Sequence, residues 1–168
     1  MELKRRVGYS MEQLRLDLRG RNSKGKILVM GIEDASSYVP DNPTYAIRIF
    51  LRKKPEALDT LFQLQSPLYK TIHEYRFNDS FFEGEPTGCL QPEQAREIIT
   101  DFRNGYRKCI DLLVHCLRGR NRSPAVAMAL NDIFQLGEDT NKMKELFPRW
   151  NDWVYQLMIH EAKSLKIT

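Results

Sequence analysis

Residues 112–136 read LLVHCLRGRNRSPAVAMALNDIFQL. The stretch opens on an apolar run at 112–114, which is typical of a buried strand. It closes on the pattern of a helix at 123–136, with Pro124 near the start and Gly137 just past the end. Between the two lies a polar loop that carries one cysteine, one glycine and three arginines. A buried strand, a tight loop and a capped helix in this order predict one unit of a layered α/β domain.

The sequence on either side continues the alternation. Apolar or alternating runs predict strands at 27–32, 46–51 and 73–77, and polar residues predict loops at 34–45 and 78–90. Helices are predicted from Pro55 (Leu58, Leu61 and Phe62 inward), from Pro92 (Ala95, Ile98, Ile99, Phe102 and Tyr106 inward) and over 150–165 (Trp153, Val154, Leu157, Met158 and Leu165 buried). We therefore expect a single α/β domain with a central, mostly parallel sheet flanked by helices.

The charge of the chain is concentrated at its start. The 168 residues include 26 Lys and Arg against 22 Asp and Glu, a net charge of +4. Residues 1–26 alone hold eight cations and three acids, so the other residues sum to −1. We expect residues 1–26 to form a basic arm or a short helix, with Ser10 and Gln13 as a capping box and Leu14 and Leu18 on one face. Residues 27–168 then form the α/β domain, whose charge does not favour a nucleic-acid-binding surface.

Three cysteines indicate the compartment. Cys89, Cys109 and Cys116 are odd in number and have unrelated spacings, which argues against a disulfide framework or a zinc site. No apolar run approaches the roughly 20 residues of a membrane span, and the N-terminus lacks the apolar core of a secretory signal. We expect a protein of the reducing cytoplasm. Reversible oxidation through Cys89 or Cys109 stays open.

The residues of the loop 115–123 suit the binding of phosphate. The loop reads His-Cys-Leu-Arg-Gly-Arg-Asn-Arg-Ser. In parallel sheets ligands bind beyond the carboxyl ends of the strands, where this loop begins. Successive backbone N–H groups and a helix N-terminus attract an anion, and Gly119 allows the sharp turn. Arg122 can hold two phosphate oxygens. The same surroundings favour the thiolate form of a cysteine, so an anion site here also activates Cys116.

The loop resembles the signature of the cysteine-dependent protein tyrosine and dual-specificity phosphatases, which is His-Cys, five residues, Arg, then Ser or Thr. Here it stands as HCLRGRNRS. Three further segments resemble small bacterial and phage-type tyrosine phosphatases: RSPAVAMAL, FNDSFFEGEPTGCLQPEQAREIITDF and FPRWNDWVYQLM. The resemblance covers about residues 26–157 and implies a dual-specificity-phosphatase-like fold.

The resemblance also implies roles. Cys116 would attack phosphorus and form a phosphocysteine, Ser123 would assist the departing thiolate, and His115 would orient the loop. No metal would be needed, because the loop neutralises the phosphate charge. The residues implied to bind phosphate are Leu117, Arg118, Gly119, Arg120, Asn121 and Arg122.

A phosphomonoester also needs a general acid, which the family takes from an aspartate on a separate loop. Asp79 is the best candidate, because it follows the strand predicted at 73–77 and stands in the matching segment FND. Glu83 and Glu85 share its loop and are the fallback acids. Asp34 and Asp41 are weaker candidates.

Arg118, Arg120 and Asn121 depart from the small residues that are common in this family's loops. Either Arg118 and Arg120 point to solvent, or one of them selects substrates with additional phosphates. The second interpretation is similar to phosphatases of inositol lipids, of phosphatidylglycerol phosphate and of RNA 5′-triphosphates. The expected partner is a phosphorylated protein or peptide, with a phospholipid or an RNA 5′ end as rivals. A phosphate-binding module of weak activity, a rhodanese-type sulfur transferase and an arsenate reductase rank lower.

Overall fold

The computed structural model describes residues 15–17, 25–53, 61–79 and 88–167. Within these ranges, five strands form one sheet in the order β1–β2–β5–β3–β4. β1 runs antiparallel to β2 and the other neighbours are parallel, which confirms the mostly parallel sheet. The strands are β1 (Arg15–Asp17), β2 (Lys26–Gly31), β3 (Thr44–Phe50), β4 (Tyr69–Arg76) and β5 (Asp111–Cys116).

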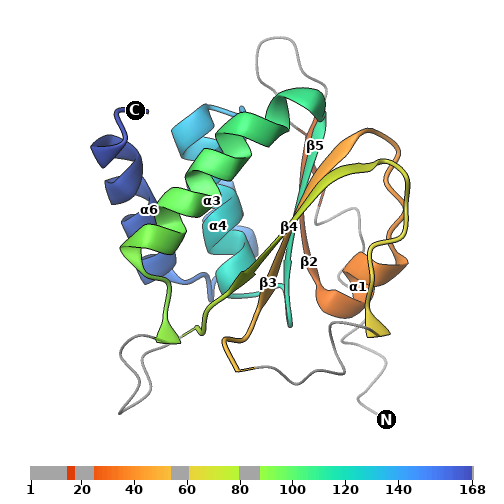
Figure 1. The fold of residues 1–168 in the computed structure, drawn as a ribbon, viewed down its shortest axis with the longest axis horizontal. Coiled ribbons are helices and arrows are strands. Elements are labelled where there is room, and N and C mark those ends of the chain that lie inside the picture. The colour runs from red at the N-terminus through yellow and green to blue at the C-terminus, as the bar shows by residue number, and fades with distance from the viewer. Residues whose placement is uncertain (1–14, 18–24, 54–60, 80–87, 168) are drawn as a thin grey trace.

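Helices cover both faces of the sheet, as Figure 1 shows, with α3, α4 and α6 on one face and α1 on the other. The helices are α1 (Ile32–Ser37), α3 (Pro92–Gly105), the 3₁₀ helix η3 (Tyr106–Lys108), α4 (Arg122–Phe134), α5 (Thr140–Leu146) and α6 (Asp152–Ser164). Within the described ranges, every helix is too short or too polar to cross a membrane. The layered α/β architecture predicted from the sequence is confirmed.

β5 lies in the middle of the sheet and divides the core in two. All six of its residues are buried, between β2 on one side and β3 on the other. Because successive side chains of a strand point to opposite faces, Val114 and Cys116 face the larger core under α3, α4 and α6. Leu113 packs in the smaller core under α1. The side chain of Cys116 therefore lies on the face of the sheet covered by α3, α4 and α6, and that of His115 lies on the opposite face.

α4 is buried on nearly every side. Its residues from Arg122 to Asn131 are all buried, and it contacts α6, β5, α5 and β2. A helix that is apolar all round fits only in the middle of a core. The small side chains of Ala125, Ala127 and Ala129 let the sheet and α6 approach it closely. The loop that precedes α4 is thus fixed by the most buried helix described.

Most of the elements predicted from the sequence are confirmed within a few residues. The strands predicted at 27–32, 46–51, 73–77 and 112–114 are β2, β3, β4 and β5, and the helices predicted from Pro92, at 123–136 and at 150–165 are α3, α4 and α6. Pro92 and a Gln91–Gln94 capping box begin α3, which buries Ala95, Ile98, Ile99 and Phe102. Tyr106 lies in η3 instead, stacked on Phe102.

Four features of the structure were not predicted from the sequence. The predicted loop at 34–45 begins with a helix, α1, because Ile32 and Ala35 are buried on one side of a single turn. β4 starts at Tyr69, four residues before the predicted strand, and α5 was not predicted. Residues 15–17, within the arm or short helix expected at 1–26, pair with β2 as an edge strand.

Two predicted core residues are exposed. Trp153 is 46% exposed, because the buried face of α6 runs through Val154, Leu157, Met158 and Ala162. Leu61 is 71% exposed instead of inward. The rest of the helix predicted from Pro55, up to residue 60, lies outside the described residues, as do Ser10, Gln13, Leu14 and Leu18.

Candidate active site

The loop from Leu117 to Asn121 turns tightly against the end of β2. Gly119 has a φ of 67°, and a Cβ there would lie 2.5 Å from the carbonyl carbon of Met30. Only glycine fits this left-handed position and this close backbone approach. The N–H of Ile32 donates to the carbonyl of Leu117 at 3.3 Å. The loop is therefore fixed by backbone contacts with β2 and the start of α1.

The thiol of Cys116 lies beside the first turn of α4. Its Sγ is 3.2 Å from Oγ of Ser123, and both residues are buried. α4 begins at Arg122, and the preceding Asn121 donates its side-chain amide to the carbonyl of Arg149 at 2.9 Å instead of capping the helix. The first N–H groups of a helix have no partner within the helix, and they favour negative charge. The arrangement suits an anion held above a sulfur nucleophile.

Arg122 connects the loop to the residues that follow β4. Its guanidinium is buried and donates from Nη1 to the carbonyl of Phe77 at 2.8 Å. Its Nε lies 3.2 Å from Oδ1 of Asp79. The structure thus brings Asp79 to Cys116, Arg122 and Ser123, the residues that the sequence singled out. A carboxyl group, a guanidinium, a hydroxyl and a thiol from two distant segments meet at this site.

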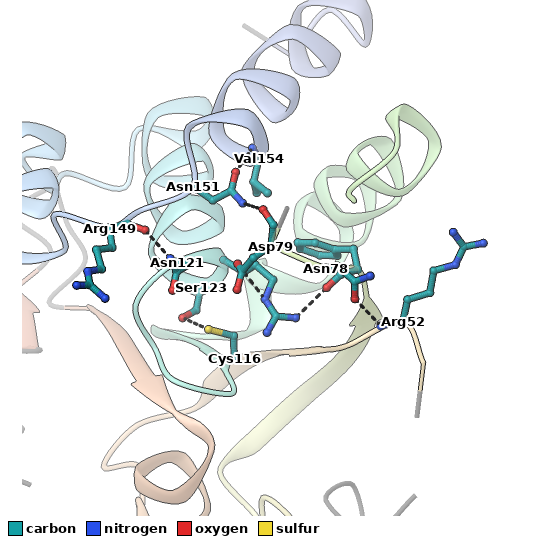
Figure 2. A network of polar contacts seen from close by, with 11 residues as sticks. Arg52, Asn78, Asp79, Cys116, Asn121, Ser123, Arg149, Asn151 and Val154 are labelled. Carbon is teal, nitrogen blue, oxygen red and sulfur yellow. Dashed lines mark hydrogen bonds and ion pairs between the residues drawn. The ribbon is translucent and has the colours of Figure 1, made fainter. Parts of the chain in front are cut away.

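Asn151 links these two segments to α6, as Figure 2 shows. Its side-chain amide donates to the backbone carbonyl of Asp79, and its own N–H donates to the carbonyl of Asn121 at 3.0 Å. Its side-chain oxygen caps α6 by accepting from the N–H of Val154 at 3.1 Å. One residue therefore holds the Asp79 backbone, the loop 117–121 and the start of α6.

Asn78 anchors the same segment from the other side. Its N–H donates to the carbonyl of Gly88 at 2.7 Å, and its Oδ1 accepts from the N–H of Arg52 at 3.2 Å (Figure 2). Asp79 is consequently fixed through the backbone on both sides, while its carboxyl group stays directed at Arg122.

His115 lies on the opposite face of the sheet from Cys116. It is 1% exposed, and its Nε2 accepts a hydrogen bond of 3.2 Å from Nε of Arg48. Burial and the positive charge of Arg48 lower the pKa of His115 to about 3, against a smaller opposing effect of the Cys116 backbone. The imidazole is therefore neutral near pH 7.

The remaining candidates lie as follows. Arg118 and Arg120 are exposed, in agreement with side chains that point to solvent, and Leu117 is 39% exposed. Asp34 is exposed on α1, and Asp41 faces Lys26 at 3.9 Å. Glu83 and Glu85 lie outside the described residues.

The other two cysteines are free thiols in less reactive surroundings. Burial raises the pKa of Cys89 and of Cys109, which favours the protonated and less nucleophilic form. Within the part of the chain that the structure describes, no three His, Cys, Asp or Glu side chains gather as metal ligands.

Sequence reasoning missed Asn151, Arg48 and the carbonyl of Phe77. The N-cap role of Asn151 could have been predicted, because an asparagine before a helical pattern indicates an N-cap. Nothing in the sequence indicated its contact with Asp79. Arg48 looked like an ordinary strand residue. Its burial follows only from the pairing of β3 with β5.

Comparison with known proteins supports the fold. No family model matches the sequence, and no curated protein matches it. Among solved structures, human DUSP28 matches 83% of this chain and 93% of its own at 15% identity, with a TM-score of 0.56. PTPMT1 matches 83% and 91% at 12% identity, with a TM-score of 0.51. Tk-PTP in its active form matches 91% and 96% at 16% identity, with a TM-score of 0.50.

Proposed function

We propose that this chain, which has the fold of the cysteine-based tyrosine and dual-specificity phosphatases, hydrolyses phosphomonoesters through a phosphocysteine on Cys116. The substrate class that we infer is phosphotyrosine, or a mixed set of phosphorylated residues, in a protein or peptide. The observation that carries the proposal is the meeting of Cys116, Ser123, Arg122 and Asp79 at the N-terminus of α4.

In the first step the thiolate of Cys116 attacks phosphorus, and the bond between phosphorus and the leaving oxygen breaks. Arg122 and the loop N–H groups stabilise the charge on the equatorial oxygens. The leaving oxygen takes a proton from the carboxyl group of Asp79. The contact between Asp79 and Arg122 supports this assignment, because the carboxyl group lies 3.2 Å from the guanidinium that would hold the phosphate.

In the second step water attacks the phosphocysteine. Asp79, now a carboxylate, takes a proton from the water, and inorganic phosphate leaves as the bond between sulfur and phosphorus breaks. The departing electron pair stays on sulfur. The hydroxyl of Ser123, at 3.2 Å from Sγ, is placed to donate a hydrogen bond to that thiolate.

The test is hydrolysis of an aryl phosphate such as p-nitrophenyl phosphate by the wild type and by Cys116→Ser and Asp79→Asn. We expect Cys116→Ser to be inactive and Asp79→Asn to lose about 10²-fold in kcat, within the range typical of general acid catalysis. Wild-type activity should decline toward high pH, where a general acid is deprotonated. Asparagine does not titrate, so the activity of Asp79→Asn should stay constant over the same pH range. Wild-type turnover by Cys116→Ser would refute the mechanism, and full activity of Asp79→Asn would reassign the acid.

The positive charges of Arg118 and Arg120 favour a second candidate, a substrate with additional phosphates. Both arginines lie in the loop 117–121 and are exposed, so one of them would turn from solvent toward the bound substrate to select it. Inositol lipids and RNA 5′-triphosphates carry such charge. Rates on a phosphotyrosyl peptide, a phosphoinositide and an RNA 5′-triphosphate separate the classes. Equal or better phosphotyrosine hydrolysis by Arg120→Ala, with no loss on the polyphosphates, would exclude this candidate.

A further inference from the structure

Arg48 is a buried cation on the face of the sheet that is turned away from Cys116. Its side chain is 3% exposed, and all three guanidinium nitrogens have partners. Nε donates to His115 Nε2 at 3.2 Å, Nη1 to Glu74 at 2.5 Å and Nη2 to the carbonyl of Phe62 at 2.5 Å. The guanidinium also lies over the ring of Phe50, 4.8 Å from its centre. The guanidinium is therefore fixed by three hydrogen bonds and by its contact with the Phe50 ring.

This fixed guanidinium determines which nitrogen of His115 carries the proton. An arginine Nε always carries hydrogen, so the Nε2 atom facing it must be the acceptor. In a neutral imidazole the single proton then sits on Nδ1. That atom is buried and lacks a hydrogen-bond partner of good geometry among the described residues. It belongs to the residue that precedes Cys116 in the chain.

Among the described residues, the other elements around His115 bring no competing charge to the ring. On β2 its neighbour is Met30, and α1 turns Ile32 and Ala35 to the sheet while its acids are exposed. Phe50 of β3 meets the imidazole edge to face, with 5.9 Å between the ring centres. The acid of β4, Glu74, binds the far side of Arg48, and Arg76 lies over Phe50. Arg48 is thus the charged group that contacts the ring.

We propose that Arg48 is a positioning residue for Cys116: it locks His115 as the neutral tautomer with hydrogen on Nδ1, and the imidazole fixed in this way, on the residue that precedes Cys116, keeps the loop 117–121 and the thiolate in a reactive geometry. The inference rests on the proposed phosphatase function. It gives His115 no part in proton transfer, because its Nε2 stays occupied by a group that cannot release its hydrogen near pH 7.

The tautomer is measured directly in the wild type by ¹⁵N-edited NMR of the imidazole nitrogens at pH 7. We expect a protonated Nδ1 and an unprotonated Nε2 at His115. A ring with hydrogen on Nε2, or a charged ring, would overturn the proposal without any variant being made.

The effect on Cys116 is measured with Arg48→Met, as the rate of alkylation by iodoacetamide at pH 6 and as kcat and KM on p-nitrophenyl phosphate. We expect both the alkylation rate and kcat to fall about tenfold, of the order that one buried hydrogen bond contributes, with KM within about twofold. Arg76→Met is the matched control. Arg76 lies over the same Phe50 ring, but its Nη1 donates to the carbonyl of Leu51, so the tautomer of His115 should not change.

A double-mutant cycle separates action through His115 from a general loss of packing. In a His115→Asn background, Arg48→Met should change the alkylation rate by less than about twofold. An undiminished loss in that background would show a merely structural role and overturn the proposal. If the wild type hydrolyses no aryl phosphate, the proposed function fails, while the NMR and alkylation results still decide the role of Arg48.

Discussion

The side chain of Asn151 donates a hydrogen bond to the backbone carbonyl of Asp79, which lies 72 positions earlier in the chain. Asn151 also caps α6 and binds Asn121 of the loop 117–121 through its N–H. The position of the candidate acid therefore depends on a residue that has no reactive group of its own.

Replacing Asn151 separates these roles. Serine keeps a capping oxygen but is too short to reach Asp79, so Asn151→Ser should lose about tenfold in kcat with little change in thermal stability. Asn151→Ala loses both contacts and should also lose about 1 kcal/mol of stability. Steady-state kinetics and thermal unfolding of the two variants check this. Unchanged kcat in Asn151→Ser would mean that Asp79 holds its position without the contact.

Ser123→Ala should affect the second chemical step more than the first. The hydroxyl lies 3.2 Å from Sγ of Cys116, where it can stabilise the thiolate that leaves the phosphocysteine. We expect a lower kcat and a burst of p-nitrophenol about equal to the enzyme concentration, because the intermediate accumulates. Stopped-flow absorbance measures the burst. A slow reaction without a burst would place the role of Ser123 in the first step.

Gly119→Ala should destabilise the protein. A Cβ at that position would lie 2.5 Å from the Met30 backbone, at a φ of 67°. We expect a loss of roughly 1–3 kcal/mol or more, measured by urea unfolding at pH 7. Gly31→Ala is the matched control, since a Cβ there would meet its nearest atoms at an ordinary 3.5 Å. Equal losses in the two variants would contradict this account of the loop.

The pH dependence of stability should report on His115. Its pKa is lowered to about 3 in the folded protein, so between about pH 6.5 and 3 the unfolded chain binds the additional proton. Stability therefore rises with pH across this window and is lost as the pH falls, by up to about 1.4 kcal/mol per pH unit. Urea midpoints of the wild type and of His115→Asn between pH 7 and 4.5 check this. The variant should have the smaller slope, and parallel slopes would argue against a buried neutral histidine.

More of the fold than of the candidate site could be predicted from the sequence. Local patterns are enough for β2, β5, α3 and α4, because their apolar residues recur at the spacing of a strand or of a helix. The grouping of Cys116, Arg122 and Ser123 was predictable for the same reason, since one short loop holds all three. The end of the arm at residue 26 and the catalytic roles stay predictions.

What the sequence could not provide are contacts between distant segments. α1 is too short for its two buried residues, Ile32 and Ala35, to form a recognisable pattern. Trp153 looks like a core residue by type, but its place on α6 leaves it half exposed. The burial of Arg48 depends on strand pairing, and the contact of Asn151 with Asp79 depends on where α6 docks. Such features arise from tertiary packing, which local periodicity does not encode.

The burial of α4 couples ligand binding to folding. The helix that presents its N-terminus to the candidate anion site is also the centre of the larger core. A ligand that binds only the folded chain raises its stability by RT ln(1 + [L]/Kd), about 2.7 kcal/mol at a hundred times Kd. The stability of the whole domain therefore depends on whether an anion is bound at the candidate site. An oxyanion at this loop would protect even remote amides of the core from hydrogen exchange.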